Sequence, residues 1–188
     1  MHRLTSHFVL GYHGCDHAVA ERLLAGEPFH PSDKEWDWLG PGIYFWEANP
    51  ERGLDWATEL KAASKIETPA VVGAVIDLGL CLDMTTQGAI QLVLDAYHKL
   101  TADLAVAGVP LPTNGKTLLA RRLDCAVIRR VHAILELQNV KLDSVRGVFT
   151  EGAPVYPGAG FDAKTHIQLC VCDPACIKGV FRVNPSRL

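Results

Sequence analysis

The chain has 188 residues, of which 48% are hydrophobic and 21% are charged, so it is long and apolar enough to bury the core of one domain. Its formal net charge of −3 gives no overall attraction to nucleic acid or to an anionic membrane, and no apolar stretch reaches the roughly 18 residues of a membrane-spanning helix. The first residues also lack the apolar core of a signal peptide, and we therefore expect a cytoplasmic protein with no membrane partner.

The first 46 residues predict two strands joined by a helix and a long loop. The apolar run 7–12 is typical of a strand. Asp16 can cap a helix whose apolar spacing continues until Gly26. The segment 27–41 is rich in Pro, Asp and Trp and predicts a loop, after which 42–46 returns as a strand.

The middle of the chain predicts three helices and one strand. Asn49 and the proline after it form a helix start, and this helix should continue to about residue 66. The apolar segment 70–78 predicts a strand. Apolar residues at helical spacing predict two long helices at 86–107 and 117–137, separated by a segment with two prolines.

The last part of the chain returns to strands. We expect them at 145–149, 167–172 and 177–183, with the Gly- and Pro-rich loop 151–164 before the second of them. Strands, a central helical pair and strands again indicate an α+β fold. We expect a single domain over residues 1–188 with a helical insert at about 86–140.

Six cysteines raise the question of disulfides or a metal site. In a chain of this length without a secretory signal, reduced thiols are expected. Cys170, Cys172 and Cys176 form a C-x-C-x3-C cluster, but the C-x2-C spacing of a zinc knuckle is absent from the sequence. The sequence therefore predicts buried small residues and no metal site.

Three short pieces of the sequence offer an imidazole, an aromatic ring and a carboxamide beside predicted strands. Alternation along the last piece puts His166 and Gln168 on one face of a strand. The three pieces are Tyr12-His13-Gly14, Gly42-Ile43-Tyr44-Phe45 and Thr165-His166-Ile167-Gln168.

In this order, the pieces resemble the active-site signature of ADP-ribosyltransferases of the poly(ADP-ribose) polymerase-like, diphtheria-toxin-type branch. His13-Gly14 matches the family's His-Gly at a strand end, and residues 42–45 match its Gly-Ile-Tyr-Phe strand letter for letter. The resemblance is best over 8–60 and 145–183. It implies a split, mostly antiparallel sheet that holds NAD as a co-substrate.

The resemblance also implies roles for single residues. His13 would bond a ribose of NAD, the backbone of Gly14 would bond the nicotinamide amide, and Tyr44 would stack on the nicotinamide ring. Trp56 stands near the family's second stacking aromatic residue.

Residues 28–41 take the place of the family's donor loop, which covers the NAD pyrophosphate. Its contacts would come from Ser32, Trp36, Asp37 and Trp38. A loop anchored on the core by its two tryptophans is the alternative. Residues 151–164 correspond to the family's acceptor-recognition loop.

Gln168 departs from the family pattern, because the polymerases usually carry Glu at this position. A carboxamide can bond a ribose hydroxyl but cannot act as a base. The departure argues against chain elongation and for single transfer or NAD hydrolysis. Glu151, Glu47 and His166 are candidates for the missing base, and Arg146 is a candidate for holding a phosphate.

Two basic pairs lie seven residues apart on the second long helix expected from the sequence. A solvated helix face and a contact to phosphate or nucleic acid both fit this pattern. The pairs are Arg121-Arg122 and Arg129-Arg130.

The sequence thus predicts an NAD-dependent mono-ADP-ribosyltransferase that modifies a protein or a nucleic acid and releases nicotinamide. A catalytic domain without fused reader modules looks like a bacterial effector of a toxin–antitoxin or phage-defence system, with an antitoxin or immunity protein as partner. An NAD glycohydrolase, a non-enzymatic module that binds NAD or ADP-ribose, and an RNA 2′-phosphotransferase are the alternatives.

Overall fold

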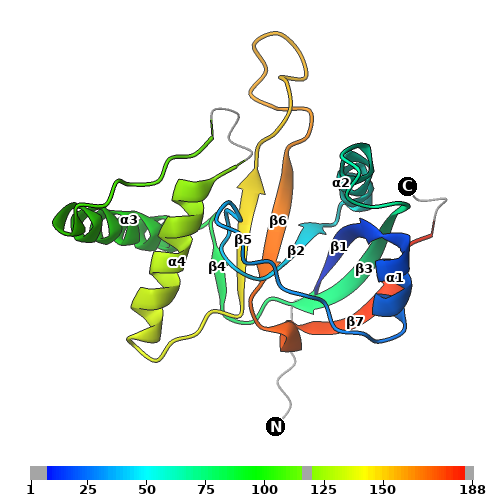
Figure 1. The fold of residues 1–188 in the computed structure, drawn as a ribbon, viewed down its shortest axis with the longest axis horizontal. Coiled ribbons are helices and arrows are strands. Elements are labelled where there is room, and N and C mark those ends of the chain that lie inside the picture. Colours follow the sequence, from blue (N-terminus) through cyan, green and yellow to red (C-terminus); the bar gives the residue numbers. More distant parts are fainter. Residues whose placement is uncertain (1–7, 116–119, 185–188) are drawn as a thin grey trace.

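The computed structural model of the chain describes residues 8–115 and 120–184. These residues form one seven-stranded sheet in the order β4-β5-β6-β2-β1-β3-β7, with four α-helices around it (Figure 1). The pairing is antiparallel except between β4 and β5, which run parallel. This arrangement confirms the expected α+β class. Within the described ranges, no helix has the length and apolarity needed to cross a membrane.

The strands and helices occupy the following parts of the chain. The strands are β1 (Phe8–Asp16), β2 (Ile43–Glu47), β3 (Pro69–Asp77), β4 (Cys81–Asp83), β5 (Ser144–Phe149), β6 (His166–Val171) and β7 (Ile177–Arg182). The helices are α1 (His17–Leu24), α2 (Pro50–Ala62), α3 (Gln87–Ala107), α4 (Arg122–Glu136) and a short 3-10 turn at Pro174–Cys176.

The sheet is split between β1 and β2. In the described residues, the ladder between these strands consists of Gly11 opposite Glu47 and Tyr12 opposite Trp46. Beyond it, β1 continues along β3 as far as Asp16, whereas β2 pairs with β6. The halves β4-β5-β6-β2 and β1-β3-β7 therefore meet over a short ladder in the middle of the sheet.

Helices α1 and α2 cover opposite faces of β1. Cys15 belongs to the core cluster that contains Leu23 of α1. The neighbouring Gly14 lies against α2, where a Cβ added to it would come within 2.0 Å of the carbonyl oxygen of Gly53. Successive strand residues point to opposite faces, so the two helices lie on the two sides of the sheet. Gly14 is needed here because the backbones of β1 and α2 approach each other closely.

Three helix starts have the caps that their sequences indicate. The side chains of Asp16, Asn49 and Thr86 accept hydrogen bonds from backbone N–H groups in the first turns of α1, α2 and α3. At the other end of α3, Gly108 has φ +67°, the left-handed conformation in which glycine commonly ends a helix. The caps expected at Asp16 and Asn49 are confirmed.

The expected boundaries were wrong in several places. β1 extends beyond residue 12 to Asp16, and α2 ends at Ala62 rather than near residue 66, followed by Ser64 with φ +56°. β4 was missed because it has three residues. Helix α4 begins at Arg122, and residues 117–119 of its expected range lie outside the described residues.

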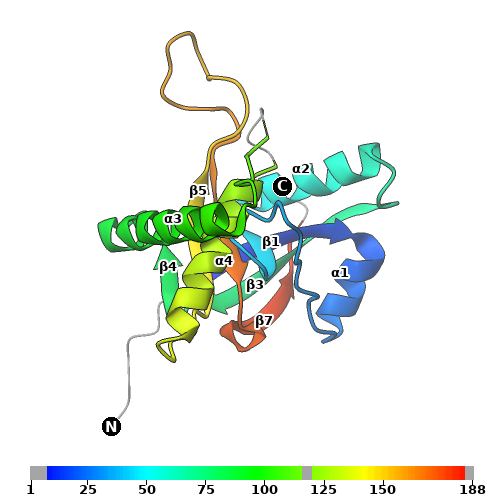
Figure 2. The same cartoon turned by 60° about the vertical axis from the view of Figure 1, so that its left-hand side comes forward.

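The central helical pair packs at the β4–β5 end of the sheet (Figures 1 and 2). Its core joins Ala96 of α3 and Val131 of α4 to Leu82 of β4 and Val145 of β5. The helices lie between β4 and β5 in the chain, and their assignment as an insert stays a prediction. The single-domain organisation over residues 1–188 stays a prediction.

Candidate active site

His13 and Tyr44 are joined where β1 and β2 part. The Nδ1 atom of His13 lies 2.8 Å from the carbonyl oxygen of Tyr44. A carbonyl oxygen only accepts, so Nδ1 carries the hydrogen. The ring of His13 packs edge-on against Phe29, with the centroids 5.3 Å apart, and burial lowers its pKa. The neutral ring therefore keeps a lone pair on Nε2.

The hydroxyl of Tyr44 holds the loop that precedes β2. It donates to the carbonyl oxygen of Gly40 at 2.8 Å and accepts from the N–H of Leu39 at 3.0 Å. Burial raises the pKa of this phenol, so the hydroxyl remains protonated. Tyr44 thus fixes the end of the loop through two hydrogen bonds.

Gln168 on β6 is bound by the same loop. Its Oε1 accepts a hydrogen bond of 2.6 Å from the indole N–H of Trp38. In the sheet, Gln168 lies between Trp46 of β2 and Gly147 of β5. A Cβ at Gly147 would approach the Trp38 ring to 2.6 Å, so the indole lies directly on the backbone of β5. The glycine makes room for the tryptophan that holds Gln168.

His166 lies two residues before Gln168, on the same face of β6. Its ring stacks on Phe149 with the centroids 5.4 Å apart, and it lies 6.3 Å from the ring of Trp46. Nδ1 lies 2.6 Å from the carbonyl oxygen of Lys164, and burial lowers the pKa. Nε2 therefore carries the lone pair, and it is buried without a hydrogen-bond partner among the described residues.

Arg52 and Glu151 form an ion pair beside this histidine. Nη2 of Arg52 lies 2.7 Å from Oε2 of Glu151, and Arg52 is only 6% exposed. The guanidinium lies 5.9 Å from the Trp46 ring. Its Nε and Nη1 atoms have no hydrogen-bond partner within the described part of the chain, although Nη1 lies 3.6 Å from Glu59. A buried cation and a neutral imidazole thus lie beside the Trp46 ring, and the cation holds a half-buried carboxylate.

The other expected site residues are distributed around this group. Trp56 of α2 is 40% exposed, and its ring lies 6.2 Å from that of Trp46. Ser32 bridges to Gly42 through backbone hydrogen bonds in both directions. Arg146 lies on the face of β5 opposite to Gly147, where it forms ion pairs with Glu47 at 2.6 Å and Asp83 at 3.2 Å. Glu47 is thus bound to Arg146, and both are separated from Gln168 by the sheet.

The structure brings one group of expected residues together and leaves His13 apart from it. Gln168 and His166 share one face, and Glu151 and Trp56 reach the same aromatic group through Arg52 and Trp46. The ring of His13 instead lies beside a cavity of about 100 Å³ between α1 and residues 27–30. His13, Tyr44 and Gln168 are connected through the backbone of β2 and through residues 38–40.

Two functional candidates were missed in the sequence. Trp46 stands two residues after Tyr44 in a strand and must share its face, so the alternation in residues 43–47 was a usable signal. Arg52 had no such signal, because an arginine in the first turn of a helix is usually solvated.

The two basic pairs are engaged within the protein, and two of their four arginines hold the loop 27–42. Nε of Arg122 lies 2.6 Å from Glu35, and Arg129 pairs with Asp33. Arg130 pairs with Asp103 of α3. The guanidinium of Arg121 lies over the rings of Phe149 at 4.1 Å and Trp38 at 4.8 Å. Each of these cations is engaged by a carboxylate or a ring.

The cysteine cluster divides between two parts of the core. Cys176 belongs to the cluster around α1, and Cys170 belongs to the cluster around α3 and α4. Over residues 8–115 and 120–184, no group of three or more His, Cys, Asp or Glu side chains could hold a metal ion.

Comparisons of this chain with protein-family models, with curated proteins and with solved structures found no match.

Proposed function

We propose that the chain transfers ADP-ribose from NAD to a macromolecular acceptor, protein or nucleic acid, and releases nicotinamide. The observation that carries the proposal is the strand order. His13, Tyr44 and Gln168 stand on β1, β2 and β6, which are consecutive in the sheet at the point where it splits. These are the three positions of the resemblance to the ADP-ribosyltransferase signature, and they lie far apart in the sequence.

The reaction breaks the bond between C1′ of the ribose and the nicotinamide nitrogen, and the bonding electrons leave with nicotinamide. The acceptor nucleophile forms a new bond to C1′ and gives its proton to a base. The transition state resembles an oxocarbenium ion, as in glycoside hydrolysis. The protein needs a donor or acceptor for the ribose hydroxyls, a flat contact for the nicotinamide ring and a base near the acceptor.

Gln168 supplies a hydrogen-bond donor in this scheme. While the loop 27–42 is closed, Oε1 is bound to the indole N–H of Trp38, so the NH₂ group is the part of the amide that is left to bond a ligand. It can donate to a ribose hydroxyl oxygen, and it adds no negative charge beside the oxocarbenium ion.

Gln168 lacks the negative charge and the basicity of the family's usual Glu, and in this proposal the neighbouring residues Glu151 and His166 supply both. Glu151 is a carboxylate held in place by Arg52, and His166 offers a lone pair on Nε2. We assign the base role to this pair, with Glu151 oriented by Arg52 and His166 next to Gln168 on the strand.

NAD can reach Tyr44 and Gln168 only after residues 38–40 move. Trp38 is hydrogen-bonded to the carboxamide of Gln168, and the backbone of Leu39 and Gly40 is hydrogen-bonded to the hydroxyl of Tyr44. In the proposed reaction, the loop 27–42 therefore opens to admit NAD and closes over it.

The test is to incubate the protein with NAD labelled in its ADP-ribose part and a cell lysate, and to follow nicotinamide release and labelled macromolecules. Protease and nuclease digestion then assign the label to protein or to nucleic acid. The variants Gln168→Ala and Tyr44→Ala should lose labelling while remaining folded by circular dichroism. Free ADP-ribose as the sole product would identify a glycohydrolase, and the absence of nicotinamide release above a protein-free control would contradict the proposal.

A further inference from the structure

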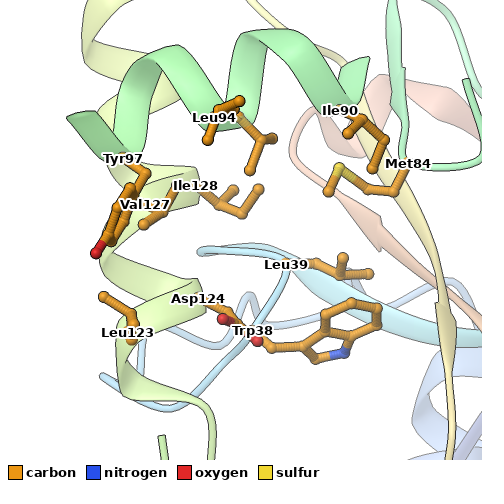
Figure 3. A pocket seen from close by; sticks show the side chains of 11 residues that line it. Trp38, Leu39, Met84, Ile90, Leu94, Tyr97, Leu123, Asp124, Val127 and Ile128 are labelled. Carbon is orange, nitrogen blue, oxygen red and sulfur yellow. The ribbon is translucent and has the colours of Figure 1, made fainter. Parts of the chain in front are cut away.

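A second cavity lies between the central helices and the loop before β2. It has a volume of about 380 Å³ and is bounded by α3, α4, Met84 and the segment Trp38–Leu39. Figure 3 shows that the side chains of these elements surround one common space. On the α3 side of the mouth, Ile90 is 47% exposed and Leu94 is 44% exposed, so the cavity opens to solvent between apolar side chains.

The lining of the cavity is apolar and partly aromatic. Trp38 and Tyr97 supply two rings, and the remaining surface comes mainly from aliphatic side chains of both helices. Asp124 is the charged residue in the lining, and its carboxylate already accepts a hydrogen bond of 2.8 Å from Asn114 and lies 3.9 Å from Arg121. Its charge is thus compensated from within the protein. A neutral occupant fits this lining better than an ion, because an ion would lose its hydration without gaining a counter-charge.

The volume of the cavity sets the size of the occupant. Pockets that bind small molecules are typically about 300–1,000 Å³, and an apolar cavity of about 150 Å³ holds a single benzene ring. A cavity of about 380 Å³ is therefore large enough for two or three fused rings. The rings of Trp38 and Tyr97 favour a flat aromatic molecule, because offset or edge-on ring contacts add to the gain from burial.

The same indole belongs to this cavity and to the candidate active site. Trp38 lines the cavity, and its N–H donates to Oε1 of Gln168. Its ring also lies against the backbone at Gly147, so a shift of the ring changes the contact with β5. An occupant that presses on Trp38 would favour one position of the carboxamide of Gln168 over another.

We propose that this cavity binds a neutral aromatic molecule of two or three fused rings, and that the bound molecule acts on Gln168 through Trp38. The binding claim can be tested whether or not the protein has enzymatic activity. The second part rests on the proposed ADP-ribosyl transfer, because it states how that reaction is regulated.

The binding test uses prodan, a neutral naphthalene whose fluorescence reports an apolar environment. The wild-type protein should bind it saturably, with one site per chain. Val93→Phe, which places a ring into the cavity from α3, should weaken binding by at least about tenfold. Ile90→Phe, at the exposed mouth, is the second variant in case the first does not fold. Val106→Phe makes a matched change on the same helix at a position that is 93% exposed, and it should bind prodan as the wild type does.

Three results would overturn the binding proposal. The first is a lack of saturable prodan binding, and the second is equal binding by Val93→Phe and Val106→Phe. The third is a wild-type dimer that dissociates in Val93→Phe, because the cavity would then be a contact between two copies of the chain.

The effect of the bound molecule on the reaction is tested by measuring the rate of nicotinamide release with and without prodan. Prodan should change the rate in the wild type and leave it unchanged in Val93→Phe. An unchanged rate in an active wild type refutes the coupling. A wild type that releases no nicotinamide refutes the proposed function instead. The prodan fluorescence result then shows by itself whether the cavity binds an aromatic molecule.

Discussion

The indole N–H of Trp38 donates a hydrogen bond of 2.6 Å to Oε1 of Gln168, although the two residues are 130 positions apart in the sequence. Because an indole nitrogen only donates, this contact fixes which way the amide faces. The loop that carries Trp38 is attached to α4 through Glu35 and Asp33. The orientation of the Gln168 amide therefore depends on how a loop from the N-terminal half of the chain rests on α4.

A methyl group at position 147 should break the contact between Trp38 and Gln168. In Gly147→Ala, the added Cβ would stand 2.6 Å from the Trp38 ring, so the indole must move away from β5. We expect the tryptophan emission to shift, nicotinamide release to change and the free energy of unfolding to fall by about 1–3 kcal/mol. Fluorescence and urea unfolding measure the first and the last of these effects.

Gly179→Ala is the matched control, since Gly179 is also in a strand and an added Cβ there meets no atom of the described residues within 4 Å. It should leave the tryptophan emission as in the wild type. The same emission spectrum in Gly147→Ala and wild type would show that the ring does not lie on β5.

Removing the hydroxyl of Tyr44 should loosen the end of the loop. Tyr44→Phe keeps the ring but leaves the N–H of Leu39 without its acceptor and the carbonyl of Gly40 with the weak thiol donor of Cys170 at 3.6 Å. We expect faster hydrogen exchange at Leu39 and a loss of about 1–3 kcal/mol in the free energy of unfolding. Exchange measured by NMR or mass spectrometry gives the answer. Tyr156→Phe, at a residue that is 56% exposed, should change neither quantity.

Local chemistry was sufficient to predict most of the elements. Asp16 and Asn49 cap helices through side chains that bond backbone groups two or three residues away, which a sequence reveals directly. β4 escaped prediction because its three residues form a strand only through parallel pairing with β5, about sixty positions later. The end of α2 was misplaced because apolar spacing continued past Ala62, where the chain turns through Ser64 at positive φ.

The composition of the site was harder to predict than the fold. Strand alternation correctly put His166 and Gln168 on one face, and it could also have pointed to Trp46. The burial of Arg52 depends on Glu151, 99 positions later, and the placement of Arg146 depends on Glu47 across the sheet. Such pairs are decided by tertiary packing, which no local pattern records.

His166 should make the stability of the protein depend on pH. Burial lowers its pKa, so the unfolded chain binds the proton more readily than the folded one. The free energy of unfolding should therefore fall as the pH drops below about 6.5, by at most about 1.4 kcal/mol per pH unit for this group. Arg52 lowers this pKa further, and the carbonyl of Lys164 and the carboxylate of Glu151 oppose the shift.

The measurement compares the wild type with His166→Phe by urea unfolding at about pH 7.5 and about pH 5.5. The difference between the two proteins removes the contributions of other groups that titrate in this pH range. These include His13, whose pKa burial also lowers, and Cys172, whose pKa is lowered by hydrogen bonding with Cys170. His166→Phe should lose less stability between the two pH values than the wild type. Equal losses would mean that His166 titrates alike in the folded and unfolded chains.

The ion pair of Arg52 and Glu151 should matter for both stability and transfer. In Arg52→Met, the Glu151 carboxylate, which is 15% exposed, loses its partner, and we expect a loss of roughly 3 kcal/mol in the free energy of unfolding. Glu151→Gln should slow transfer under the proposed function, and the double variant should be more stable than the sum of the single losses predicts. Arg22→Met is the control, because its pair with Glu27 is more than half exposed and should contribute less than about 1 kcal/mol. Equal losses in Arg52→Met and Arg22→Met would contradict a largely buried pair, and unchanged transfer in Glu151→Gln would leave His166 as the base.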